Sequence, residues 1–300
     1  MSFGVNPESA AINSIDNQKR SEDIKNTADK LLPYHEKIAP TLEKMSIDPD
    51  DFADLYDKDV IAKDKEYVER LKQDFQKTAL EPMPGAAGLT RGDVKKLSEI
   101  SEFQVFRGIN LGDWFNYCKI IKTSEFDDYA KGFDGALEFV HPKMSGHLGI
   151  GIDVSFSHKK KKKFQRAKDE IDNFDGKENV MGTIRYFKSP RSGITGRLTN
   201  LPRVVTAMDI GVIEDMVKLK KLDDHIFRYA MIREVEEQLE VMSEYAGDTG
   251  SKAYDTLKRN HHFFEMLSEG LDAEETLKRS EYRKNKDAEA AIKRGLAKFR

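Results

Sequence analysis

Two strand-like runs that each carry an acidic residue constrain the fold of this chain more than any other feature. Asp134 directly precedes the run GALEFV, and Asp153 stands at the centre of the run LGIGIDVSF. A short Pro/Gly/Ser/His connection joins the runs, and five consecutive lysines follow the second. A buried carboxylate is costly unless it is paired, hydrogen-bonded or bound to a metal. Neighbouring strands that both carry an aspartate therefore predict a site built around these acids.

The alternation of side chains along a strand predicts which residues share that site. Asp134 and Glu138 fall on one side of the first run, and Asp153 and Ser155 share a side of the second. Paired strands would bring Asp134 and Asp153 within reach of one ion. Carboxylate oxygens suit Mg²⁺ or Mn²⁺, which complete their shells with water and phosphate oxygens. Such a metal would polarise a phosphodiester and lower the pKa of an attacking water.

The pattern along the rest of the chain predicts an α/β (α+β) fold, with a mixed four-stranded sheet flanked by helices. Two further strands are expected at 180–187 and 201–210, and helices at 94–106, 111–121 and 164–174. The segment 81–93 is the clearest loop, and 189–200 is expected to be irregular. The chain is thus expected to divide into a flexible arm (1–20), a helical N-terminal region (21–90), an α/β core (91–215) and a helical C-terminal region (216–300).

Prolines and glycines set several of these expected boundaries. Pro33 and Pro40 are expected to break the N-terminal helical region into short pieces. Gly108 is expected to end the helix that begins near Asp93, its predicted N-cap.

Composition limits the classes of partner and compartment. The net charge is −3, so any affinity for nucleic acid has to come from a local patch. The single cysteine, Cys118, excludes a disulfide framework and fits a reducing interior. The first residues have no secretory signal pattern, and no window approaches the length of an apolar membrane span. We therefore expect a soluble, cytoplasmic protein with no membrane association.

The segments GFDGALEF and GIDVSFS, set in the order helix, strand, strand, helix, strand, resemble the PD-(D/E)xK nuclease-like superfamily. The resemblance implies a restriction-endonuclease-like core, with Asp134 as the first acid and Asp153 as the second. More narrowly, DDYAKGFDGALEF, IGIDVSFS, FQRAKDEID, TIRYFKS and LPRVVTAMD resemble a group of uncharacterised proteins from small-genome bacterial lineages. Together these segments cover residues 127 to 210.

The sequence departs from the superfamily pattern at one position. Ser155 stands where the family keeps its catalytic lysine, two residues after the second acid. The resemblance leaves Arg185, Lys188 or the start of the lysine run as replacements. It also allows a helix acid in the site, either Glu99 or Glu102.

The lysine run is a dense positive segment beside the expected acidic site. If the segment is functional, its lysines would contact the phosphates of a nucleic acid without regard to base sequence. The alternative interpretation is that the segment is simply a charged surface exposed to solvent. The residues concerned are Lys159, Lys160, Lys161, Lys162, Lys163 and Arg166.

Each candidate acid also has a purely structural interpretation. Asp134 fits a turn aspartate that caps backbone donors, and Asp153 fits a partnered core acid. Asp127 and Asp128 fit loop or capping residues, and Glu138 fits a surface or supporting group. His261 and His262 fit a packed helix face better than a metal site, and Trp114 and Cys118, four residues apart, fit the core.

These observations lead to three functional hypotheses. The first is a Mg²⁺-dependent nuclease that hydrolyses DNA or RNA with Asp134 and Asp153. The second is a catalytically inactive nuclease fold that serves as a nucleic-acid- or protein-binding module, because the usual lysine is missing. The third is a protein that binds partners through its helical extensions.

Overall fold

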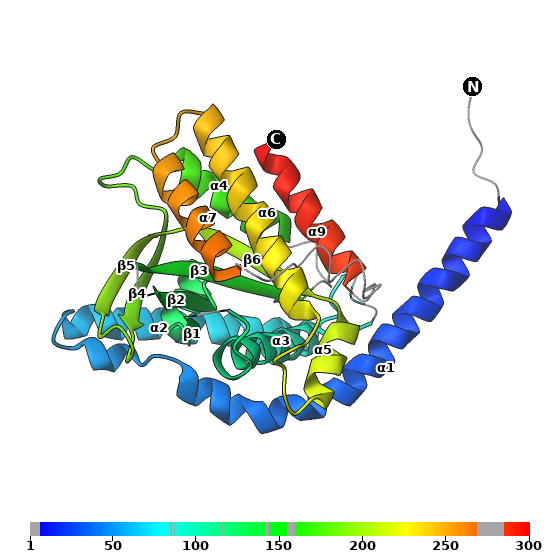
Figure 1. The fold of residues 1–300 in the computed structure, drawn as a ribbon. Helices are drawn as coiled ribbons and strands as arrows, with labels where there is room; N and C mark the ends of the chain where they lie inside the picture. Colours follow the sequence, from blue (N-terminus) through cyan, green and yellow to red (C-terminus); the bar gives the residue numbers. More distant parts are fainter. Residues whose placement is uncertain are drawn as a thin grey trace.

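The computed structural model describes residues 7–84, 86, 88–115, 117–141, 144–154, 160–268 and 285–300. For 7–17, 140–141, 144–145, 150–154, 160 and 267 it describes the backbone alone. The described chain forms a mixed α/β structure in which helices surround a four-stranded sheet (Figure 1). Among its described helices, none is long and apolar enough to cross a membrane.

The four-stranded sheet has the order β1-β2-β3-β6. Strands β1, β2 and β3 are antiparallel neighbours, and β6 runs parallel to β3. The mixed four-stranded sheet is therefore confirmed, but its membership differs from the prediction. The strands are β1 (Cys118–Lys122), β2 (Gly135–His141), β3 (Met144–Val154) and β6 (Arg203–Met208).

Strand β1 replaces a predicted helix. The segment 111–121 has helical spacing, yet its second half pairs along β2, where Ile120 faces Leu137. Helix α3 (Arg91–Leu111) continues through Gly108 and ends at Leu111, the first residue of that segment. A Cβ at Gly108 would lie 2.4 Å from the Trp114 ring, so glycine permits close packing there and does not end the helix. The N-cap is Thr90, which forms a capping box with Asp93.

The predicted strand at 180–187 lies outside the main sheet. It forms β4 (Gly182–Lys188), which pairs with β5 (Thr195–Leu201) in a separate two-stranded sheet. β5 falls in the segment that was expected to be irregular. The side chains of Phe133, Ala136, Ile184, Phe187 and Leu201 form a small core that joins this hairpin to β2.

The long helix α1 (Pro7–Met45) contradicts the expected breaks in the N-terminal region, because it continues through Pro33 and Pro40. It begins before residue 21, where the helical region was expected to start, and the predicted flexibility of residues 1–20 stays a prediction. Its buried residues are spaced along one stripe and belong to the same hydrophobic core as α3 and the sheet. Tertiary packing of that stripe compensates for the backbone hydrogen bonds that the prolines remove. The buried residues are Ala28, Leu31, Ile38 and Leu42.

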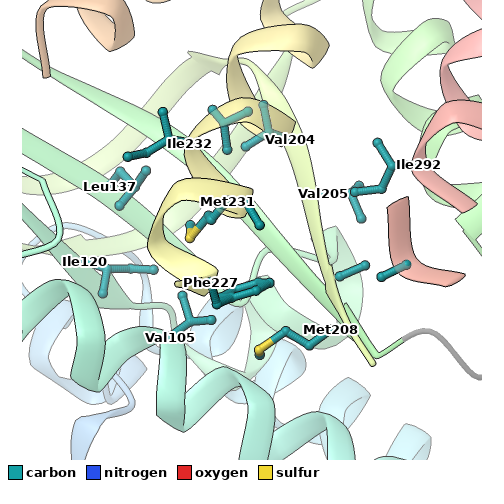
Figure 2. Close-up of a cluster of buried hydrophobic side chains, with 14 of the residues drawn as sticks. Val105, Ile120, Leu137, Val204, Val205, Met208, Phe227, Met231, Ile232 and Ile292 are labelled. Atoms are coloured by element: carbon teal, nitrogen blue, oxygen red, sulfur yellow. The ribbon is translucent and has the colours of Figure 1, made fainter. Parts of the chain in front are cut away.

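The main core lies on both faces of the sheet. Figure 2 shows Val105 of α3 and Phe227 of α6 near Ile120 and Leu137 of the sheet. Val205 turns to the other face and lies beside Ile292. The remaining elements are η1 (Pro49–Phe52), α2 (Lys58–Thr78), the π-helix η2 (Asp127–Lys131), α4 (Lys160–Asp172), α5 (Ile210–Lys218), α6 (Phe227–Asp248), α7 (Tyr254–Ser268), α9 (Lys286–Leu296) and η3 (Ala297–Phe299).

Candidate functional site

A pocket of about 850 Å³ lies between the N-terminal helices and the start of β2. Helices α1, α2 and α3, the end of β1 and the π-helix η2 all contribute to its wall. The ionisable side chains in this wall are His35, Glu43, Asp48, Lys65, Glu69, Lys72, Lys95, Glu99, Glu102, Lys122, Glu125, Asp128, Tyr129 and Asp134. The predicted first acid, Asp134, therefore lies in a polar pocket.

The backbone around Gly132 positions Asp134 at the pocket. Gly132 ends η2 with a left-handed conformation, φ 66°, which glycine adopts without steric cost. The Arg203 guanidinium donates to the Gly132 carbonyl at 2.6 Å and to the Lys131 carbonyl at 2.9 Å. Thr123 donates from its backbone N–H to the Asp134 carbonyl at 3.2 Å. These bonds hold the turn from η2 into β2, and Asp134 stands at its end.

Asp127 and Asp128 are adjacent but have different roles. The buried carboxylate of Asp127 accepts from the backbone N–H groups of Arg185 at 2.7 Å and Tyr186 at 3.0 Å, and from Ser124 Oγ at 2.8 Å. Burial raises the pKa of Asp127, against the lowering effect of these hydrogen bonds. Asp127 thus caps backbone donors, as in its structural interpretation. Asp128 lines the pocket.

Helix α3 and strand β1 add an ion pair to the same pocket. Glu102 accepts from Lys122, and their side chains are only 8% and 11% exposed. Lys122 pairs with Gly135 in the β1–β2 register, one residue after Asp134. The sequence suggested Glu99 or Glu102 as a helix acid in the site. Both residues line the pocket, and Glu102 is paired with Lys122.

Crowding of the acids changes their protonation. Burial raises the pKa of Glu102, and the charges of Asp134 and Asp128 add to that effect against the opposing charge of Lys122. Burial also raises the pKa of Asp128, and Asp134 contributes in the same direction. The pKa of Lys122 is raised by Glu102 and Asp128, although burial opposes this. The carboxylates therefore repel one another in a site that holds a charged lysine.

The other predicted cations lie elsewhere. Arg185 forms an ion pair with Asp64 of α2, and its guanidinium lies 4.8 Å from the centre of the Phe126 ring. Lys188 forms an exposed pair with Asp51 at 2.8 Å. Neither residue lines the pocket, whereas Lys122 does. The sequence prediction missed Lys122 because it assigned the preceding residues to a helix.

The second predicted acid is described only in part. Asp153 belongs to β3, and its backbone pairs in register with Ala207. Gly135 pairs with Ile150, so Asp134 and Asp153 lie at the same end of the sheet. The side chain of Asp153 lies outside the described residues, as does Ser155, so their predicted roles stay predictions.

The basic segment is also described in part. Lys159 and the side chain of Lys160 lie outside the described residues, while Lys161 and Lys162 are exposed. Lys163 is half-buried, and its charge lowers the pKa of Asp128. Arg166 donates to the carbonyls of Lys131 at 2.8 Å and Ala130 at 3.4 Å, so it caps the end of η2.

The remaining candidates lie outside the pocket. Glu138 is buried and accepts from Ser189 Oγ at 2.7 Å. Trp114 and Cys118 are core residues, as expected. His261 and His262 each lie near Glu265 on α7.

Within the described part of the chain, no group of three or more His, Cys, Asp or Glu side chains is arranged to hold a metal ion. Comparison with protein-family models, curated proteins and solved structures gives no match for this chain. The chemistry of the pocket therefore has to follow from its own side chains.

Proposed function

We propose that this protein is a Mg²⁺- or Mn²⁺-dependent nuclease that hydrolyses a phosphodiester of DNA or RNA in the Asp134 pocket. The observation that carries the proposal is the convergence of Asp134 with Glu102, Asp128 and Lys122 in one pocket. Carboxylates beside a lysine can hold a hard cation and also stabilise charge on a phosphoryl oxygen.

The topology supports a restriction-endonuclease-like core. The order α3, β1, β2, β3, α4, β6 supplies a helix, three antiparallel strands, a second helix and a parallel strand. Asp134 directly precedes the second strand of this set, and Asp153 belongs to the third. This arrangement agrees with the PD-(D/E)xK resemblance, in which the two acids belong to these strands.

The donor chemistry of the pocket fits a hard divalent cation. Asp134 and Asp128, together with Asp153, would hold it, because a cation would relieve the repulsion by which the charge of Asp134 raises the pKa of Asp128 and of Glu102. When bound, the ion would supply Lewis-acid polarisation of the phosphodiester. Hydrolysis forms a bond from the water oxygen to phosphorus and breaks the bond to the leaving sugar oxygen, which receives a proton.

Lys122 takes the role that the superfamily assigns to a lysine after the second acid. Its ammonium carries a fixed positive charge beside Asp134, and Glu102 holds it in place. A cation so placed stabilises the negative charge that develops on the phosphoryl oxygens.

The second candidate function is a catalytically inactive nuclease fold that binds nucleic acid or protein. The Lys122–Glu102 pair favours this alternative, because each charge already has a buried partner.

Titration of Mn²⁺ into the protein tests the proposal, followed by cleavage assays on DNA and RNA. We expect millimolar or tighter binding by the wild type, at least tenfold weaker binding by Asp134→Asn and Asp153→Ala, and loss of cleavage in both. Asp224→Asn changes an exposed acid in a turn and should leave both properties unchanged. Metal binding without cleavage of any nucleic acid would favour the inactive module, and no binding at all would reject the metal site.

A further inference from the structure

The walls of the Asp134 pocket limit what can reach the acids. We infer that the substrate is a single-stranded segment of nucleic acid and not an intact duplex; this inference rests on the proposed function. A volume of about 850 Å³ is that of a site for a small ligand, and one or two nucleotides are ligands of this size. A duplex would have to bring two backbones and its paired bases to the same place.

The N-terminal helices α1 and α2 line the pocket and contact the segment that follows β1. Ser46 at the end of α1 donates to the Thr123 carbonyl at 3.1 Å. Lys72 of α2 pairs with Glu125, just before η2, at 2.7 Å. These two contacts connect α1 and α2 to the segment between β1 and η2. A nucleic acid that reaches Asp134 therefore has to fit beside α1 and α2, which a single strand does more easily than a duplex.

One wall of the pocket has the side chains that single strands need. Lys95 Nζ lies 5.1 Å from the centre of the Phe75 ring and 4.9 Å from that of Tyr129. Lys95 also hydrogen-bonds to the Tyr129 hydroxyl. The three residues come from α2, α3 and η2, and all are half-buried. An ammonium between two rings offers a partner for a phosphate, and a base would stack on the ring faces turned away from Lys95.

Stacking on these rings distinguishes the two forms of nucleic acid. Bases in a duplex already stack on their neighbours, so they reach an aromatic side chain only after they are unpaired. Unpaired bases stack on aromatic side chains with little dependence on sequence. Phe75 and Tyr129 would thus select a single strand, and Lys95 would orient its backbone towards Asp134.

The test compares cleavage of one labelled 12-nucleotide DNA as a single strand and as a blunt duplex, and of the RNA of the same sequence in both forms, with Mn²⁺. We expect the single strand to be cleaved at least tenfold faster than the duplex. Phe75→Leu keeps an apolar side chain but removes the ring, and should raise the KM for the single strand about tenfold with kcat within about twofold. Lys95→Gln should also raise KM.

Lys258→Gln is the matched control. Lys258 lies 5.2 Å from the centre of the Tyr254 ring on α7, so it repeats the lysine–tyrosine contact outside the pocket. Its variant should keep the wild-type KM. Equal cleavage of single strand and duplex, or an unchanged KM in Phe75→Leu, would overturn the inference and leave the nuclease proposal standing. Absence of cleavage on all four substrates would overturn both.

Discussion

The ammonium of Lys122 and the carboxylate of Glu102 form an ion pair in the wall of the pocket that Asp134 also lines. Lys122 comes from the last position of β1 and Glu102 from the middle of α3. Both side chains are nearly buried, so each charge depends on the other for its stability.

Removing one member of this pair should destabilise the protein strongly. Lys122→Met leaves Glu102 buried without its cation. At pH 9, above the raised pKa of about 8 of Glu102, it should lower the free energy of unfolding by about 3–5 kcal/mol. The double variant Lys122→Met/Glu102→Gln should recover much of the loss, because no uncompensated charge remains. Urea denaturation measures both values. Lys77→Met breaks an exposed pair with Asp74 and should cost less than about 1 kcal/mol; a similar cost for Lys122→Met would contradict the buried role.

Asp128 should make stability depend on pH. Its folded pKa is raised above the unfolded value, so the folded state binds the extra proton and loses relative stability as pH rises from the ordinary carboxyl range to the raised pKa. Asp128→Asn should remove this contribution. The unfolding free energy of the wild type should therefore fall relative to that of the variant between about pH 4 and pH 7, by about 1.4 kcal/mol for each pH unit that separates the two pKa values.

The difference between the two proteins cancels the contributions of Asp127 and His147, which are present in both. It includes the accompanying change at Glu102, because the charge of Asp128 helps to raise the pKa of Glu102. Parallel pH curves for wild type and Asp128→Asn would reject the assignment.

The neighbouring aspartate should behave differently. Asp127→Ala removes the acceptor of two backbone N–H groups and one hydroxyl at the join between η2 and β4. We expect a loss of about 2–4 kcal/mol of unfolding free energy, since buried donors are left without partners. Asp128→Ala should not lower stability at pH 8 but should weaken Mn²⁺ binding. Equal effects of the two substitutions on both properties would contradict the division of roles.

Gly108 gives a test of the packing that sets the length of α3. Gly108→Ala would place a Cβ 2.4 Å from the Trp114 ring and should lower the melting temperature, at a cost of about 1–3 kcal/mol. Gly211→Ala, near the start of α5, meets nothing within 4 Å and should be neutral or slightly stabilising. A neutral Gly108→Ala would show that Trp114 can move away.

Prediction from the sequence succeeded for segments whose hydrophobic spacing matches the helix or strand that they form in the folded protein. The two acid-bearing strands, the helix after the lysine run and the parallel strand β6 all occur near their expected positions. It failed for β1, because the residues from Leu111 to Ile121 also have helical spacing and only pairing with β2 selects the strand. It failed for α1 because packing on α3 outweighs the cost of Pro33 and Pro40.

The sequence by itself determined the α/β class and the strand that follows Asp134. These features depend on alternation and residue type, which can be read along the chain. Only the tertiary structure decided that Lys122 and Glu102, not Arg185 and Lys188, lie beside Asp134. The reason is that β1 pairs into the main sheet whereas β4 pairs only with β5 in a separate sheet. Which strands pair with one another cannot be read from the local sequence of either strand.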